Sequence, residues 1–399
     1  MTQFNPRVEA MRPSATLAMT AMANQLRQQG IPIIGLSAGE PDFPTPMPIV
    51  EAAIGALRAG RGFTYTDNAG LLELRQEISE KFARENLLEY SAKEIICSNG
   101  GKQSVAQALM VLCRPGDEVL IPSPYWVSYP EMTVLAGGTP IPMPTTVETE
   151  YRITPKQLEN AITQHTRVLI LCSPSNPTGS VYSPDELEAL AEVLRRHPQV
   201  WVISDELYEH VIFDAKHISF ASLKGMKERT VTINGLSKAY AMTGWRLGYA
   251  AAPLDVVKAM DKVQSQTTSN ASHLSQIAGI AALRMDFEPI AKMVKAFRER
   301  RDTVLTLLDD IKGLNCPKPE GAFYLFPDVS AFFGKTAPNG RLIQNAEQLC
   351  LYLLQEAHVA AVSGEGFGDP NGLRISYATS LDKLVEAVRR IKTALDGLN

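Results

Sequence analysis

The sequence predicts an α/β fold with a second, smaller unit toward its C-terminal end, and two observations carry this prediction. Short runs rich in β-branched residues alternate with stretches of helical periodicity, which is the pattern of parallel strands joined by right-handed crossovers. After Leu283 the pattern changes to a long, charged, amphipathic helix followed by further strand-like runs. A chain of 399 residues is long enough for about two or three domains, so each unit can bury a core of its own.

The elements of both units can be assigned in chain order from the spacing of apolar residues. The strands expected in the main unit are Glu94–Ser98, Glu118–Pro122, Val168–Cys172, Val200–Ser204, Thr230–Asn234 and Leu247–Ala251. Between the first two, apolar residues at helical spacing predict a helix from Lys102 to Leu112. The smaller unit is expected to contain a long helix in residues 287–313, strands in "AFYLFPDVS" and "GLRISYA", and a closing helix over Leu381–Leu398.

Composition excludes several classes of function. The formal net charge is −4 and the Lys and Arg residues are scattered, so nucleic acid is not an expected partner. No apolar run approaches the roughly 18 residues of a membrane span, and the N-terminal stretch lacks the apolar region of a signal peptide, which predicts a cytoplasmic protein without a membrane partner. The five cysteines form no CxxC pair and the six histidines show no ligand spacing, so no metal site is expected.

Glycines and amides follow two of the expected strands. Gly100 and Gly101, in "SNGGKQS", end a strand and open a helix, where free backbone N–H groups and the positive helix end can hold a phosphate. Simple turn chemistry is the alternative for such glycines. Asn176, in "CSPSNPTGSVYSPDE", is by itself equally well explained as a helix cap or a turn former.

A carboxylate and an amine end two further strands. Asp205 closes the apolar run "WVISD" and is followed by Tyr208. A carboxylate at the end of a buried strand needs a cation or hydrogen bonds, since burying it alone costs several kcal/mol. Lys238 and Arg246 stand among small and apolar residues in "NGLSKAYAMTGWRLGYAAAP", although two solvated surface cations are the ordinary alternative. Ligands gather at the carboxyl ends of parallel strands, so these side chains are expected to meet.

Together these groups fit one ligand that has a phosphate, a phenolic oxygen, an aldehyde and a ring nitrogen, namely pyridoxal 5'-phosphate. Lys238 supplies an amine that can bond to the aldehyde once desolvation removes its proton. Asp205 supplies a negative charge for the ring N–H, with a Coulomb energy of about 4 kcal/mol at contact distance for an effective dielectric near 20. That charge keeps the ring an electron sink.

The order of the motifs identifies the chain as a member of the class I aminotransferases among the fold-type I pyridoxal-phosphate enzymes. It resembles the aspartate aminotransferase branch of many bacteria and of plastids, some of whose members also accept prephenate. The resemblance runs nearly end to end through "RPSAT", "GEPDFPTP", "YTDNAGL", "NGGKQ", "SPYWVSYPE", "SPSNPTG", "SDELYEH", "SKAYAMTGWRLGY" and "GLRISYA". Any one of these motifs carries a risk of chance matching that the ordered set does not.

The resemblance also implies the architecture. It predicts a mostly parallel central sheet sandwiched by helices, with a smaller α+β domain built from both chain ends. The expected boundaries are an N-terminal arm and first part of the small domain in residues 1–47, a large cofactor-binding domain in residues 48–290, and the rest of the small domain in residues 291–399. The resemblance further implies a homodimer with shared active sites.

Residue roles follow from the same resemblance. It implies that Lys238 bonds to the cofactor and transfers protons, while Asp205 pairs with the ring nitrogen. The remaining assignments give the phenolic oxygen to Asn176 and Tyr208, ring stacking to Trp126, the phosphate to Arg246 and the amides of Gly101 and Lys102, the partner's phosphate to Tyr65, and the substrate α-carboxylate to Arg374 and Gly39. For Trp126 the alternative is an ordinary core aromatic residue. For Arg374 the assigned task suits the planar, bidentate guanidinium.

One departure from the animal-type enzymes concerns the distal carboxylate of the substrate. Those enzymes bind it with a second arginine from the partner subunit, but the matching stretch "QSQTTSNAS" has none. The resemblance instead assigns Lys102 to this carboxylate, helped by Thr16, with Arg12 as a further candidate. Lys102 stands at a helix start, where the helix dipole disfavours a cation, and this favours an anionic partner over a plain surface lysine. Dicarboxylic amino acids and 2-oxo acids are therefore the expected substrates.

Three alternatives share the same cofactor residues, and fold similarity alone does not choose among them. The scaffold also serves lyases and synthases that eliminate at the β- or γ-carbon, and aminotransferases that prefer aromatic or other neutral amino acids. A non-catalytic regulatory domain is the third, but the chain lacks an N-terminal helix-turn-helix extension. Lys102 together with Arg374 favours reversible amino transfer between L-aspartate and 2-oxoglutarate, with prephenate as a possible further acceptor.

Overall fold

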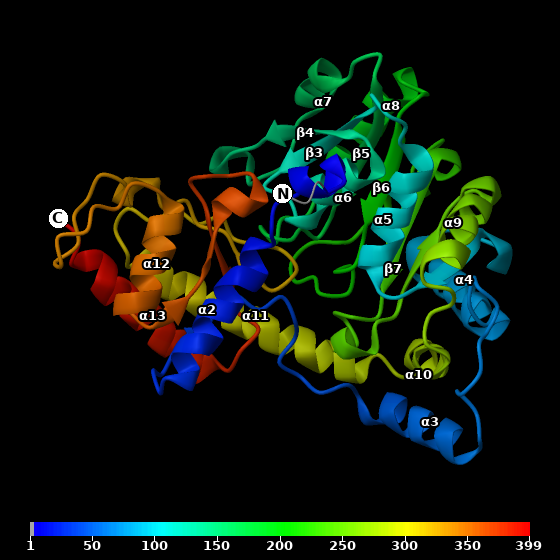
Figure 1. The fold of residues 1–399 in the computed structure, drawn as a ribbon, viewed down its shortest axis with the longest axis horizontal. Coiled ribbons are helices and arrows are strands. Elements are labelled where there is room, and N and C mark those ends of the chain that lie inside the picture. The colour runs from blue at the N-terminus through cyan, green and yellow to red at the C-terminus, as the bar shows by residue number, and fades with distance from the viewer. Residues whose placement is uncertain (1–3) are drawn as a thin grey trace.

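A seven-stranded sheet forms the centre of the computed structural model, which describes residues 4–399 (Figure 1). The strand order is β2-β8-β7-β6-β5-β3-β4. The strands are β2 Ile95–Ser98, β3 Glu118–Ser123, β4 Thr139–Pro144, β5 Thr166–Cys172, β6 Trp201–Asp205, β7 Thr230–Gly235 and β8 Gly248–Ala251. β8 runs antiparallel to β2 and to β7, whereas the other neighbouring strands pair in parallel. The predicted mostly parallel sheet is therefore confirmed.

Helices cover both faces of this sheet because successive side chains of a strand point to opposite sides. Along β5, Val168 and Ile170 belong to one buried cluster, while Leu169 and Leu171 belong to another. The first cluster includes side chains from α5 (Gly101–Leu112), α6 (Ser128–Ala136) and α9 (Leu254–Thr267), and the second includes side chains from α7 (Pro155–Ala161) and α8 (Pro184–Arg196). Such a strand is apolar on both faces, as expected for a buried parallel sheet.

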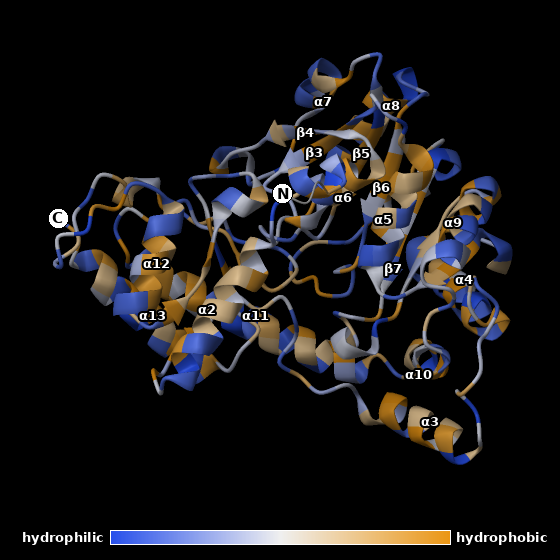
Figure 2. Ribbon diagram, viewed as in Figure 1, coloured by the Kyte–Doolittle hydropathy of each residue, from blue (hydrophilic) through white to orange (hydrophobic). Residues whose placement is uncertain are grey.

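Three more helices pack at the β2–β8 edge. They are α3 (Met47–Arg58), α4 (Leu72–Asn86) and α10 (His273–Arg284). α10 contacts both α3 and α4. α3 lies at the lower right of the molecule, and Figure 2 shows it largely in the colours of hydrophobic residues. Met47 and Leu57 of this helix are exposed.

A smaller α+β unit takes its core from both ends of the described chain. Its helices are α2 (Ala15–Gln28), α11 (Glu288–Asp309), α12 (Ala346–Glu356) and α13 (Leu381–Asp396). Its strands are β9 (Tyr324–Leu325), β11 (Val362–Ser363) and β12 (Leu373–Ser376) in one sheet, and β1 (Ile34–Gly35) paired with β10 (Val359–Ala360). Met19 and Leu395 belong to one buried cluster, and Figure 1 shows α2 beside α11, α12 and α13. A short helix, α1 (Pro6–Ala10), contacts α6.

α11 joins the two units. Ile290, in its first turn, is buried in the cluster of the β2–β8 edge, while Phe297 and Leu308 are buried in the small unit. The predicted domain boundaries at residues 47/48 and 290/291 stay predictions. Within residues 4–399, no helix is both long and apolar enough to cross a membrane.

The predicted elements agree with the structure in most places. All six expected strands are present, with ends shifted by one or two residues, and the expected helices correspond to α5, α11 and α13. The strand expected in "AFYLFPDVS" is present but short, because only Tyr324 and Leu325 pair with β12. β4 was not predicted, since its sequence "TPIPMP" contains three prolines. Proline is tolerated there because β4 is an edge strand with one pairing partner.

Candidate functional site

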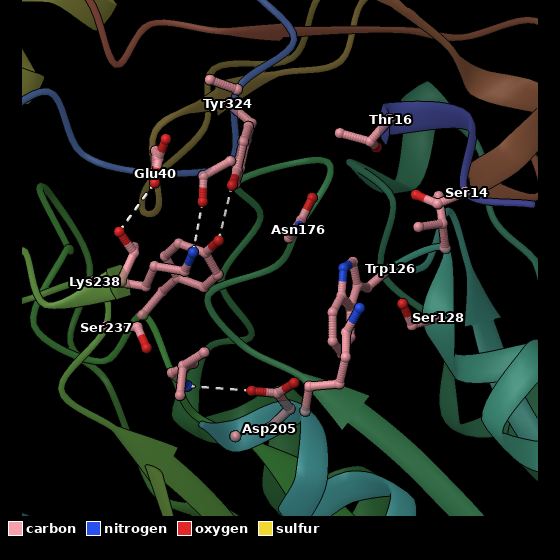
Figure 3. Close-up of a pocket in the computed structure, with 18 of the residues that line it drawn as sticks. Ser14, Thr16, Glu40, Trp126, Ser128, Asn176, Asp205, Ser237, Lys238 and Tyr324 are labelled. Atoms are coloured by element: carbon pink, nitrogen blue, oxygen red, sulfur yellow. Dashed lines mark hydrogen bonds between the residues drawn. The ribbon is translucent and has the colours of Figure 1, made fainter. Parts of the chain in front are cut away.

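The ends of the parallel strands and the small unit enclose a cavity of about 430 Å³. The predicted residues that line it are Thr16, Gly39, Gly101, Lys102, Trp126, Asn176, Asp205, Tyr208, Lys238, Arg246 and Arg374. They come from the loops after β3, β5 and β7, from the end of β6 and the turn after it, from the start of α5 and from the small unit. Figure 3 shows Lys238, Asp205, Trp126 and Tyr324 around the same space.

Lys238 follows β7 and points into the cavity (Figure 3). Its Nζ donates a hydrogen bond to the carbonyl oxygen of Gly39 at 2.5 Å. Burial lowers the pKa of Lys238 to about 8, an effect that the negative charges of Glu40 and Asp205 partly oppose. The chain therefore holds an amine that can lose its proton close to neutral pH, as a nucleophile or base requires.

Asp205 is the last residue of β6 and is buried. The hydroxyl of Tyr129 donates to its Oδ2 at 2.6 Å, and the backbone N–H of Leu207 donates to its Oδ1 at 3.3 Å. Burial raises the pKa of Asp205, while these hydrogen bonds and the charge of Lys238 act in the opposite direction. Among the described residues no cationic side chain forms an ion pair with it, so this carboxylate is suited to a cationic group of a ligand.

The N-terminus of α5 and Arg246 form the anion-binding end of the cavity. Gly100, which caps α5, has φ +85° and no side chain to cover the first N–H groups. A Cβ on Gly100 would lie 2.4 Å from Nη2 of Arg246, so only glycine allows this close approach. The guanidinium donates to the carbonyls of Thr243 and Asn99 at 3.0 and 3.1 Å. Both features place positive charge at one point.

Arg374 is a buried cation on β12 with 2% of its surface exposed. It donates to Oδ1 of Asn176 at 3.0 Å and to the carbonyl of Ser37 at 2.7 Å. Its Nε is buried without a hydrogen-bond partner within the described chain, and burial lowers the pKa of Arg374. Since an unpaired buried donor is costly, the arrangement is suited to an incoming carboxylate.

Lys102 and Trp126 lie together on the cavity wall. Nζ of Lys102 is 4.9 Å from the centre of the Trp126 ring. Partial burial, together with the positive charge of Arg246, lowers the pKa of Lys102. Thr16 and Ser14 of the α2 segment approach from the side of the small unit (Figure 3).

Two predicted residues lie outside this cavity. Arg12 lines a neighbouring cavity of about 280 Å³ and forms an ion pair with Glu131 at 3.5 Å. Tyr65 is 89% exposed, in the loop between α3 and α4. Neither side chain joins the other site residues within a single chain, and their predicted roles stay predictions.

Sequence reasoning did not single out two tyrosines of the cavity wall. Tyr129 binds Asp205, and its position three residues after Trp126, about one helical turn, was a usable signal. The hydroxyl of Tyr324 lies 2.8 Å from that of Tyr208. Tyr324 comes from a short apolar strand whose pattern gives no sign of a functional role.

The sequence and the structure of this chain are similar to those of the same group of known proteins. Residues 31–391 match the family described as aminotransferase class I and II. A bifunctional aspartate aminotransferase and glutamate/aspartate-prephenate aminotransferase from Petunia hybrida is 54% identical over 396 residues, covering 98% of this chain and 82% of the relative. An aspartate/prephenate aminotransferase from Cereibacter sphaeroides is 48% identical, with 100% of both chains covered. The crystal structure of the aspartate aminotransferase from Rhizobium meliloti is 44% identical and has a TM-score of 0.96, with 100% of both chains covered.

Proposed function

The chain belongs to the class I and II aminotransferase family, and we propose that it transfers an amino group reversibly between L-aspartate and 2-oxoglutarate, with pyridoxal 5'-phosphate as its cofactor. Its fold is the fold-type I arrangement that the sequence predicted. The observation that carries the proposal is the placement of Lys238, Asp205 and Arg374 around one cavity. Prephenate, which is named as a substrate of the relatives, is a proposed further acceptor because it also carries two carboxylates.

The donor set of the cavity fits this cofactor. Asp205 is a buried carboxylate without a cationic partner among the described residues, suited to a ring N–H, and the start of α5 with Arg246 is suited to a phosphate. Asn176 and Tyr208 would hold the phenolic oxygen, and Trp126 would cover the ring. When bound, pyridoxal 5'-phosphate supplies an electron sink that stabilises the negative charge left on the substrate Cα.

The chain itself supplies positioning and proton transfer. Arg374, fixed by Asn176 and by the carbonyl of Ser37, would bind the substrate α-carboxylate in a bidentate manner. Lys102, from the start of α5, and Thr16, from α2 of the small unit, would bind the distal carboxylate. The amine of Lys238, whose pKa burial lowers to about 8, would carry the proton from the substrate Cα to C4' of the cofactor, because its two protonation states lie close in free energy near neutral pH.

Exposed apolar side chains support a homodimer with shared sites. Met47 and Leu57 on α3, and Phe63 and Tyr65 in the loop that follows, are all exposed large residues gathered in one segment of the large unit. An exposed apolar patch of this kind indicates a protein interface. We propose that Tyr65 extends from it to the phosphate site of the partner subunit. A cytoplasmic location stays a prediction.

A steady-state screen tests the proposed function. Aspartate, glutamate, alanine and phenylalanine serve as donors against 2-oxoglutarate, oxaloacetate and prephenate, with the amino acid and 2-oxo acid products quantified. We expect aspartate with 2-oxoglutarate to give the highest kcat/KM and equal amounts of the two products. Release of ammonia in place of a second amino acid would indicate a lyase, and a preference for phenylalanine would indicate an aminotransferase for neutral substrates. No turnover with any donor would contradict the proposal and leave cofactor binding alone.

A further inference from the structure

The catalytic turn consists of Asp205, the last residue of β6, and residues 206–210 that follow it, and it carries two kinds of side chain. Asp205 and Tyr208 line the cavity. Glu206 and Glu209, each one residue further along, are 1% and 6% exposed and do not line it. Glu206 accepts hydrogen bonds from Ser204, Ser219 and the N–H of Phe220, and lies 3.2 Å from His217. Residues 206–210 belong to neither a helix nor a strand. The hydrogen bonds of the buried Glu206 carboxylate therefore help to hold the turn in place.

Glu209 connects this turn to two other elements. From α4, Lys81 forms an ion pair with its Oε1, and Asn86 donates to its Oε2 at 2.8 Å. From β7, Asn234 donates to its Oε1 at 2.7 Å. Lys81 also donates to Oδ1 of Asn86 at 2.8 Å. Burial alone would raise the pKa of Glu209, but Lys81 and the nearby His210 and His217 hold it well below its usual range.

Asn234 brings the network to the strand that carries Lys238. It is the second-last residue of β7, is 2% exposed, and accepts a hydrogen bond from the N–H of Gly235 at 2.7 Å. Lys238 follows four residues later in the chain. A single buried carboxylate thus links the turn that bears Asp205 and Tyr208 with the end of the strand that leads to Lys238.

The same buried group does not suit a metal ion. Glu206, Glu209 and His217 have oxygen and nitrogen atoms close enough together to act as ligands, but the ammonium of Lys81 already pairs with Glu209. A buried ion pair adds little net stability compared with apolar side chains of the same size. Its directional bonds, in contrast, fix the relative positions of the elements that they join.

We propose that Lys81, Glu209 and Asn234 are positioning residues that hold the catalytic turn of Asp205 and Tyr208 in register with Lys238. None of the three lines the cavity, so they act through the residues that do. This inference rests on the proposed function, because it assigns Asp205 and Lys238 to one reaction. It predicts that a substitution in this network lowers kcat, whereas a substitution elsewhere in β7 that lowers thermal stability by a similar amount leaves kcat nearly unchanged.

The test compares the two ends of β7. Asn234→Leu removes the link between Glu209 and the strand. Thr230→Val is the matched control at the other end of the same strand, where the fully buried hydroxyl donates to the carbonyl of Met226 at 2.7 Å. We expect thermal midpoints lowered by similar amounts in both variants. With aspartate as donor, kcat should fall about tenfold in Asn234→Leu with KM changed less than about threefold, whereas kcat of Thr230→Val should stay within about twofold of wild type.

A second measurement needs no cofactor and no turnover. The rate at which acetic anhydride acetylates Lys238 in the cofactor-free protein, read by peptide mass spectrometry, reports the environment of the amine. We expect this rate to change in Asn234→Leu and to be unchanged in Thr230→Val. The acetylation rate of an exposed lysine such as Lys292 serves as the internal reference.

Two further variants keep the test decisive if Asn234→Leu does not fold. Glu209→Met keeps an unbranched side chain but removes both acceptor oxygens, and Lys81→Met/Glu209→Met also removes the ammonium that would be left unpaired. We expect the double variant to regain thermal stability while kcat stays about tenfold low. Recovery of kcat together with stability in the double variant, or equal losses of kcat in Asn234→Leu and Thr230→Val, would overturn the positioning role. Failure of the wild-type protein to transaminate aspartate would instead overturn the proposed function, and the acetylation rates would still report on the network.

Discussion

Replacement of Lys102 by methionine tests how the distal carboxylate is bound. Methionine keeps an unbranched stem beside Trp126, where the lysine amine lies 4.9 Å from the ring centre, and removes the ammonium with its charge and its hydrogen-bond donors. A hydrogen bond to a charged group is worth about 1.5–3 kcal/mol. Because Lys102 is only partly buried and also reaches solvent at the cavity wall, solvent screening places its contribution near the lower limit. A loss of about 1.5 kcal/mol corresponds to a roughly tenfold lower kcat/KM for aspartate.

The assay separates this effect from damage to the cofactor site. Lys102 also lies at the start of α5, which is the proposed phosphate site, so its loss could affect every substrate equally. In a ping-pong reaction, kcat/KM for the donor depends only on the first half-reaction, so aspartate and alanine can be compared without interference from the dicarboxylic acceptor. We expect a tenfold loss with aspartate and less than about a twofold change with alanine. An equal loss with both donors would refute the contact and leave Thr16 or Arg12 as the remaining candidates.

Three further predictions concern the cavity and the proposed dimer. Burial lowers the pKa of Lys238 to about 8, below its value in the unfolded chain. Below pH 8 the amine is charged in both the folded and the unfolded state, so the buried ammonium lowers the free energy of unfolding of the cofactor-free protein by its full amount. This destabilisation disappears once the amine is neutral in both states. Lys238→Met should therefore raise the thermal midpoint most below pH 8, and this advantage should shrink as pH rises to about 10; an advantage that grows with pH would show the opposite sign. Tyr129→Phe removes the hydroxyl that donates to Asp205, so kcat should fall about tenfold and cofactor affinity, measured by fluorescence titration, should weaken; unchanged values would mean that this bond is dispensable. Tyr65→Phe should weaken cofactor retention, and mixing it with Lys238→Ala should restore one complete site per hybrid dimer, so inactive hybrids would contradict shared sites.

The fold was predictable where apolar spacing is regular. β5, β6 and β7 are short runs buried on both faces, and the turn-rich segments after them carry the site residues. β4 was missed because its three prolines argue against a strand unless the strand lies at an edge, and edge position is not visible in a single sequence. The short pairing of Tyr324 and Leu325 depends on β12, which follows some fifty residues later.

The site was predictable to the extent that its residues are identified by chemistry or by motif. Lys238, Asp205 and Arg374 were expected, and the structure places all three around one cavity. The groups that orient them were not expected. Glu209 meets Lys81 and Asn234 across long separations in sequence, and a buried lysine in an amphipathic helix has the same sequence pattern as an exposed one. Such contacts depend on tertiary packing, which local periodicity does not encode.

The core shared by α2 and α11–α13 has a consequence for synthesis in the cell. Ribosomes add about 5–20 residues per second, and domains generally fold from the N-terminus onward. The seven strands of the large sheet all lie within residues 95–251, so they can pair while translation continues. Met19 and Ala23, in contrast, pack in a cluster whose other members include Met293 and Leu395. α2 is therefore synthesised roughly tens of seconds before the helices that cover its apolar side, and for that interval this side lacks its packing partners.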